Sequence, residues 1–121
     1  MKSKSAGQIF LSPRFRVTCG KEIAFGPGKA GLLALIEETG SINQAAKRMS
    51  MSYMRAWSLI RTMNRCFKRP LVLAIHGGEG GGGAELTETG RKILELYKQM
   101  ENQSARATRA AWGKMRPHLK S

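Results

Sequence analysis

Residues 38–67 read ETGSINQAAKRMSMSYMRAWSLIRTMNRCF and contain two helix starts in quick succession. Ser41 has the context of a helix N-cap, with Gln44 three residues later as in a capping box. Ser52 is a second N-cap, directly after the short Ser50-Met51 connection. We therefore expect a helix from Tyr53 to about Phe67, preceded by a short helix whose inner side carries Ile42, Ala45, Ala46 and Met49. Two helices joined by so tight a turn are typical of a helix-turn-helix.

The residues before this stretch predict a β-hairpin and a first helix. Hydrophobic side chains alternate on both sides of Cys19-Gly20, at Phe15, Val17, Ile23 and Phe25. The breaker Gly26-Pro27-Gly28 ends this pattern. A helical pattern starts at Lys29 and is terminated by Gly40, and its apolar face carries Leu32, Leu35, Ile36 and Thr39.

The residues after it predict a second hairpin and a final helix. Pro70 ends the helical pattern, and residues 71–75 form an apolar run of strand length. Residues 76–83 hold six glycines, and residues 84–86 can return as the antiparallel strand. Thr87 is an N-cap for a helix that begins near Glu88 and ends at Pro117 at the latest.

This order of elements predicts a winged helix-turn-helix, a mainly α fold with small β-hairpins (α+β), with an N-terminal hairpin and a long C-terminal helix. We expect a basic flexible arm over residues 1–12 and a DNA-binding domain over residues 13–116. The domain includes a dimerisation helix over residues 88–116, and residues 117–121 form a tail.

Charge indicates the class of partner. The chain has 21 lysines and arginines against 8 acidic residues, a net charge of +13, and its pI is about 10.6. Such a balance favours a polyanion, and double-stranded DNA is the partner expected for this fold. The alternatives are a protein that is merely basic, or one that rests on anionic lipid, for which the chain lacks a strong basic amphipathic helix. The longest apolar stretches have five residues and no signal peptide is evident, so we expect a cytoplasmic protein.

The helix that follows Ser52 separates into two faces. Ala56, Ile60, Met63 and Phe67 fall within about 60° of one another on a helical wheel and predict the buried stripe. The opposite face is free of acidic residues, whereas a solvated helix normally mixes both signs. We expect this face to bind DNA, with Trp57 either half-buried or in contact with it. Near base edges we expect Tyr53, Met54, Arg55 and Ser58, beside the cap Ser52, and against phosphates Arg61 and Arg65. The preceding helix should position the duplex through Gln44, Lys47 and Arg48.

The glycine-rich segment is expected to be the wing. Its residues are His76, Gly77, Gly78, Gly80, Gly81, Gly82 and Gly83. They satisfy G-x-G-x-x-G, but Ala84-Glu85-Leu86 separates the glycines from the next helix, and no βαβ unit follows, which argues against a dinucleotide site. Glycine allows the backbone to approach DNA closely.

Catalytic signals are weak. The chain has two histidines, two cysteines and no aspartate, too few for a zinc set or a Ser-His-Asp triad. We expect no enzymatic activity, no cofactor and no bound metal, and both cysteines reduced.

Several of these motifs together resemble one family. Ser52-Tyr-x-x-Ala-Trp57, the polyglycine wing and Leu86-Thr-Glu-Thr-Gly-Arg91 are similar to the N-terminal domain of the ModE family of molybdate-dependent transcriptional regulators, over roughly residues 15–100. LysR-type regulators share Gly40-Ser-x-x-x-Ala-Ala46 and Leu86-Thr-x-x-Gly90 but lack the first two features. The resemblance implies a winged-helix homodimer that binds a palindromic operator, usually as a repressor. Molybdate-sensing members carry a further oxyanion-binding region, and no molybdate site is recognisable in this chain.

Dimerisation is also expected from the final helix. Its apolar stripe is too long for one small core and consists of Ile93, Tyr97, Met100, Ala107 and Ala111. The alternative is that this stripe packs within the chain, onto the first helix and hairpin. The alternative function is a non-specific nucleoid-associated or RNA-binding basic protein.

Overall fold

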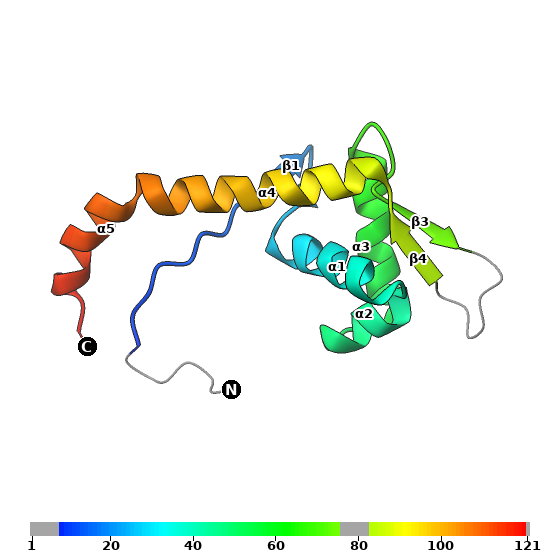
Figure 1. The fold of residues 1–121 in the computed structure, drawn as a ribbon, viewed down its shortest axis with the longest axis horizontal. Helices are drawn as coiled ribbons and strands as arrows, with labels where there is room; N and C mark the ends of the chain where they lie inside the picture. The colour runs from blue at the N-terminus through cyan, green and yellow to red at the C-terminus, as the bar shows by residue number, and fades with distance from the viewer. Residues whose placement is uncertain (1–7, 76–82, 121) are drawn as a thin grey trace.

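The computed structural model describes residues 8–75 and 83–120. It contains, in chain order, β1 (Val17–Cys19), β2 (Glu22–Phe25), α1 (Pro27–Thr39), α2 (Ile42–Arg48), α3 (Tyr53–Cys66), β3 (Val72–Ile75), β4 (Gly83–Leu86), α4 (Glu88–Ala107), α5 (Arg109–Met115) and a 3-10 turn over Arg116–His118. β1 pairs with β2 and β3 with β4, both antiparallel. The predicted fold class, mainly α with two small hairpins in the winged-helix order, is confirmed (Figure 1).

One apolar core joins α1, α2, α3 and α4 to both hairpins. Its fully buried side chains include Leu33 and Ile36 from α1, Ile42 from α2 and Ile60 from α3. Leu71 closes the core beside β3. The face expected for α1 is only partly right, because Leu33 is buried as well, whereas Leu35 and Thr39 are half-buried. α1 contacts α2, α3, α4 and β4, so it is covered on more than one side.

The predicted caps are present, with one difference. Ser41 Oγ accepts a hydrogen bond from the Gln44 N–H at 3.0 Å, and Ser52 Oγ accepts one from the Arg55 N–H at 3.0 Å. The Ser41 N–H donates to Thr39 Oγ1 at 3.2 Å instead of to the Gln44 side chain. The capping box is therefore only half formed, because the preceding helix supplies the second acceptor.

The final helix differs from the continuous 88–116 helix that we expected. α4 ends at Ala107, and α5 resumes at Arg109 after Thr108. The Thr108 hydroxyl donates to the Ser104 carbonyl at 2.7 Å, a local bond that competes with regular helix geometry. α4 crosses the domain with its first half, and its second half projects away from it with α5 (Figure 1). We call residues 98–118 the C-terminal arm. Within the described residues, no helix is long and apolar enough to span a membrane.

Candidate nucleic-acid interface

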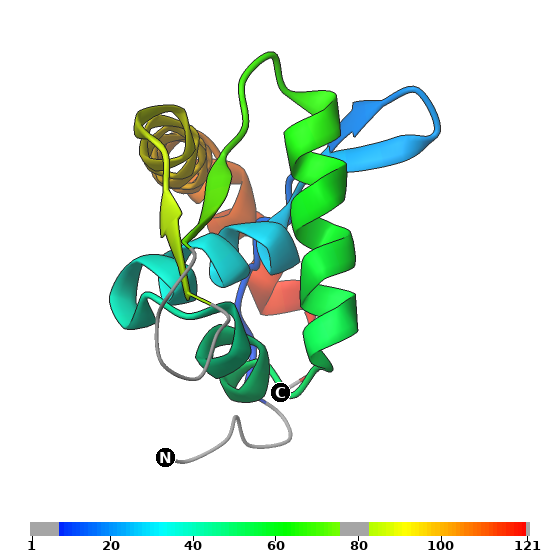
Figure 2. The same ribbon diagram turned by 90° about the vertical axis from the view of Figure 1, so that its right-hand side faces the viewer.

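The orientation of α3 decides which of its residues are available to a ligand. Ala56, Ile60 and Met63 are fully buried, as the sequence predicts, and Phe67 is half-buried. The opposite side is open to solvent, and Met54 is 69% exposed. The residues we expected at DNA are all exposed on this helix or its cap: Ser52, Tyr53, Met54, Arg55, Ser58, Arg61 and Arg65. Figure 2 shows α3 along one side of the domain, with α2 beside its first turn.

The arginines of α3 are not equivalent. Arg65 Nη2 lies 2.6 Å from Glu22 Oε1 of β2, so a carboxylate neutralises part of its charge. Arg61 has no ion pair among the described residues. The uncompensated positive charge of α3 therefore lies in its first three turns. In its last turn, the carboxylate of Glu22 partly neutralises the charge of Arg65.

The first turn of α3 carries an aromatic pair. The rings of Tyr53 and Trp57 meet edge to face, with centroids 6.4 Å apart. Trp57 is half-buried and packs against the core, which favours the packing role over the DNA contact. Tyr53 is 38% exposed, so part of its ring remains open to a ligand.

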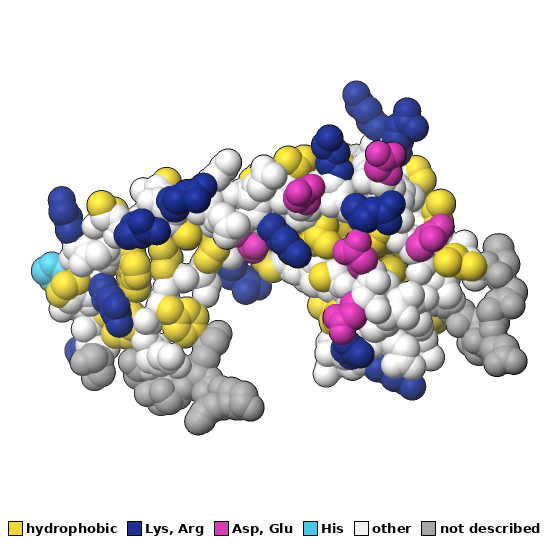
Figure 3. Space-filling view, in the orientation of Figure 1, with side chains coloured by type: hydrophobic (Ala, Val, Ile, Leu, Met, Phe, Trp, Pro, Cys, Tyr) yellow, Lys and Arg dark blue, Asp and Glu magenta, His cyan; other side chains and the backbone are white. Residues whose placement is uncertain are grey.

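α2 places its polar side outward. Gln44, Lys47 and Arg48 are all exposed. Arg48 Nη1 lies 2.8 Å from Glu38 Oε2 at the end of α1, so this arginine is engaged within the chain. Neither α2 nor α3 contains an acidic residue. Figure 3 shows acidic side chains on the face that α4 crosses, and Glu88, Glu95 and Glu101 belong to α4.

The wing is described only at its base. Ile75 pairs with Gly83, and Gly83 also forms a bridge to Ser41. The Ala84 N–H donates to the Gly40 carbonyl at 3.1 Å, which ties the base of the hairpin to the start of α2. His76, Gly77, Gly78, Gly80, Gly81 and Gly82 lie outside the described residues.

Asn64, on the inner flank of α3, connects that helix to the wing. Its Oδ1 accepts from the N–H groups of Leu71 (2.8 Å) and Val72 (3.4 Å), and its Nδ2 donates to the Val72 carbonyl (3.2 Å). Sequence reasoning missed this role, because an asparagine inside a helix gives no sign of a partner eight residues away.

A cationic cavity was also missed. A hollow of about 240 Å³ beside α3 is lined by Arg14, Arg16, Lys29 and Arg55, together with glycine, proline and apolar residues. The Arg16 side chain passes over Gly26, where an added Cβ would lie 3.5 Å from Arg16 Cγ. Burial lowers the pKa of Lys29, and the neighbouring charge of Arg55 lowers it further. The cations come from three separate segments, so no local pattern could reveal them.

The residues expected at a dimer interface fall into two groups. Tyr97 is buried in its own chain, since its ring packs edge to face on Phe25 at 5.2 Å and its hydroxyl donates to the Phe15 carbonyl at 2.8 Å. We therefore correct the expectation for Tyr97: it belongs to the intramolecular core. Ile93 is half-buried, whereas Met100, Ala107 and Ala111 are exposed.

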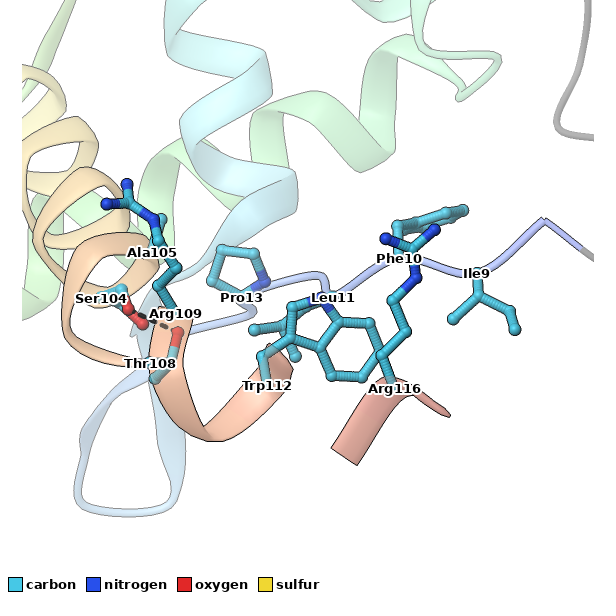
Figure 4. Close-up of a pocket in the computed structure, with 10 residues that line it drawn as sticks. All are labelled: Ile9, Phe10, Leu11, Pro13, Ser104, Ala105, Thr108, Arg109, Trp112 and Arg116. Atoms are coloured by element: carbon cyan, nitrogen blue, oxygen red, sulfur yellow. Dashed lines mark hydrogen bonds between the residues drawn. The ribbon is translucent and has the colours of Figure 1, made fainter. Parts of the chain in front are cut away.

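The C-terminal arm has its own apolar hollow. Leu11 and Pro13 of the N-terminal segment lie beside Trp112 of α5 (Figure 4). With residues of α4 they line a cavity of about 440 Å³. A second hollow between β1 and α4 is lined by Val17, Leu96 and Met100, among other apolar and aromatic residues. In the described part of the chain, no group of three or more His, Cys, Asp or Glu side chains is placed to hold a metal ion.

Comparison with known proteins gives close relatives over part of the chain. No protein-family profile matches. The chain is 49% identical over 70 residues to "Molybdenum transport protein ModE" of Azotobacter vinelandii, a match that covers 58% of this chain and 26% of the relative. It is 42% identical over 76 residues to "Molybdenum-pterin-binding protein MopB" of Rhodobacter capsulatus, covering 63% and 28%. It is 44% identical over 71 residues to the "DNA-binding transcriptional dual regulator ModE" of Escherichia coli (strain K12), covering 59% and 27%.

The matched segment spans little more than a quarter of each of these relatives. Identities of this size over about 60% of the chain confirm the resemblance that the motifs indicated.

Proposed function

We propose that this chain, a homologue of the ModE regulators, is a DNA-binding transcriptional regulator that recognises a specific duplex sequence. The observation that carries the proposal is the exposed, acid-free face of α3, which is held outward by the burial of Ala56, Ile60 and Met63. A relative with 44% identity is named a DNA-binding transcriptional regulator. A face that is only cationic and neutral repels itself in water and is stabilised against phosphates.

In this proposal α3 enters the major groove. Its first residues, Tyr53, Met54 and Ser58, are exposed on the side that faces the duplex and contact base edges. Arg61 binds a phosphate, and Lys47 and Gln44 of α2 hold the backbone where that helix crosses it. The wing, fixed at its base to Gly40 and Ser41, leans on the same duplex.

We also propose a homodimer that binds a palindromic operator. The C-terminal arm projects beyond the core of its own chain and exposes Met100 (39%) and Met115 (59%), and Leu96 (43%), just before the arm, is exposed as well. A second copy would cover this surface, and a two-fold axis would place the two α3 helices about 34 Å apart or a multiple of that distance. Light scattering and sedimentation should give the mass of two chains. Met100→Glu should give one chain, and the control Asn102→Glu, exposed on the opposite side of the same helix, should remain a dimer. A wild-type protein that stays monomeric at high concentration would refute the dimer.

Repression and a response to molybdenum are proposed from kinship alone, since the names of relatives refer to molybdenum transport and molybdenum-pterin binding. Measuring operator affinity with and without molybdate tests the response. Measuring transcription from the operator with and without the protein tests whether the protein represses or activates.

Selection of preferred duplexes from random DNA tests the main proposal. We expect an affinity for the selected sequence at least ~10³-fold above that for random duplex at the same salt. Arg61→Gln should reduce the magnitude of the salt slope by about one unit, and Lys92→Gln, an exposed cation on α4, should not. Equal affinity for all duplexes would favour a non-specific nucleoid-associated or RNA-binding protein.

A further inference from the structure

The cavity beside α3 is lined by four cationic side chains, a composition suited to binding an anion. Arg14 and Arg16 come from the segment before β1, Lys29 from the first turn of α1, and Arg55 from the first turn of α3. None of the described residues that line the cavity is acidic. The first turn of α1 contains no acidic residue either.

Two of the four cations, Lys29 and Arg55, are close enough for the charge of Arg55 to disfavour the charge of Lys29 in the free protein. Lys29 is partly buried, and its ammonium group loses hydration beside the charge of Arg55, which favours the neutral amine. Glu22 is the carboxylate that acts on Lys29, but its Oε1 already lies 2.6 Å from Arg65. Folding thus holds like charges around an open hollow without a committed counter-ion in the described residues.

The cavity also lies where a duplex would pass. Arg55 and Leu59 are one turn apart on the flank of α3, between the buried stripe and the outward face, and both line the hollow. The major groove is about 12 Å wide, so the flanks of a helix inside it face the two phosphate backbones. An arginine on the flank and directed at a basic hollow is placed for a phosphate oxygen, not for a base edge.

We propose that this cavity binds one phosphate group of the DNA backbone, held by Arg14, Arg16, Lys29 and Arg55. This inference rests on the proposed function and reassigns Arg55 from base contact to backbone contact. The same chemistry would accept free inorganic phosphate, so the test must separate the two sources. The bound phosphate supplies the negative charge that the cluster lacks, and it clamps the N-terminal segment and α1 to the duplex.

The first arm of the test uses duplex DNA and four variants. Lys29→Gln, Arg16→Gln and Arg55→Gln should each reduce the magnitude of the slope of log K against log salt by about one unit. The sequence selected by each variant should remain that of the wild type, because phosphate contacts do not distinguish bases. Lys92→Gln is the matched control, since it removes one exposed cation from α4, on the side of the domain away from α2 (Figures 1 and 2). Its slope should equal that of the wild type.

The second arm measures thermal unfolding without DNA. Lys29→Gln should raise Tm in chloride because it removes a repulsive charge, a result that sets it apart from a variant that simply damages the fold. Inorganic phosphate, compared with chloride at equal ionic strength, should raise the Tm of the wild type and of Lys92→Gln more than that of Lys29→Gln or Arg16→Gln.

The salt slopes and the Tm values together decide what the cavity binds. Reduced slopes in the cavity variants support the backbone phosphate. Unchanged slopes with a cavity-dependent phosphate effect on Tm would overturn the DNA assignment and identify a free-anion site. If the cavity variants match Lys92→Gln in both arms, the inference is wrong while the proposed function stands. If the wild type binds no duplex, the proposed function fails and the Tm arm alone decides whether the cavity binds phosphate.

Discussion

Asn64 of α3 accepts a hydrogen bond from the backbone N–H of Leu71, the residue that leads into β3, at 2.8 Å. With its two further bonds to Val72, this side chain connects the helix proposed to enter the groove to the hairpin proposed to flank it. The spacing between helix and wing is therefore fixed by one amide as well as by the core.

Replacing Asn64 should loosen that connection. Asn64→Ala leaves the Leu71 N–H and the Val72 carbonyl without their partner and should lower the free energy of unfolding by about 2 kcal/mol in urea denaturation. Asn64→Asp keeps the acceptor and should cost less. The control Asn102→Ala, exposed on α4, should change stability by no more than about 0.5 kcal/mol. Equal effects at the two positions would contradict the connecting role.

Gly90 permits a close contact between α4 and the strand entry. A Cβ built on Gly90 would lie 2.2 Å from the Leu71 carbonyl oxygen, which also accepts the Thr87 N–H at 2.9 Å. Gly90→Ala must displace backbone and should cost about 3 kcal/mol. Gly113→Ala is the matched control, because nothing lies within 4 Å of its added methyl, and it should raise stability by up to about 1 kcal/mol. Calorimetry of both variants compares them, and a Gly90→Ala protein as stable as wild type would show that α4 does not need this approach.

Ser50 is strained in the turn between α2 and α3. Its φ is +56°, the left-handed region that favours glycine. Ser50→Gly should therefore stabilise the protein by about 1 kcal/mol, and Ser50→Ala should not. Chemical denaturation measures both changes, and a loss of stability in the glycine variant would mean that the serine side chain matters more than the backbone strain.

The ion pair between Glu22 and Arg65 limits the charge that α3 presents. Glu22→Gln should release Arg65 toward phosphate, increase the magnitude of the salt slope for random duplex and tighten non-specific binding. The double variant Glu22→Gln/Arg65→Gln should return to the wild-type slope or below it. If Glu22→Gln leaves the slope unchanged, Arg65 lies away from the duplex.

The phenol of Tyr97 is expected to lose its proton at a higher pH than an ordinary tyrosine. Burial raises the pKa of its phenol above the ordinary value of about 10, and the charge of Glu101 adds to the effect. Since the folded pKa is the higher one, the stabilisation is complete below about pH 10 and is lost as pH rises through the folded pKa. Tyr53→Phe leaves Tyr97 as the sole tyrosine, so the absorbance of tyrosinate gives its midpoint directly. A midpoint at or below 10 would place the ring in water. Tyr97→Phe, which removes the bond to the Phe15 carbonyl, should cost about 1 kcal/mol.

Local signals predicted most of the fold. Ser41, Ser52 and Thr87 mark helix starts because each hydroxyl oxygen accepts a hydrogen bond from the backbone N–H three residues later, within the same few residues of sequence. The inward stripe of α3 follows from helical periodicity and needs no knowledge of its partners. The same reasoning was less accurate for α1, whose burial depends on elements on several sides, and for the end of α4, where Thr108 interrupts the helix.

The sequence by itself determined that a cationic helix follows a short capped one and turns a hydrophobic stripe inward, because spacing along one helix is a local property. Only the tertiary structure decided which cationic side chains remain available to bind a ligand. Glu22 reaches Arg65 across 43 positions, Tyr97 reaches Phe15 across 82, and Arg14, Arg16, Lys29 and Arg55 meet around one hollow. Such meetings depend on how the core brings distant segments together, and a charge is neutralised or left free only once those segments are in place.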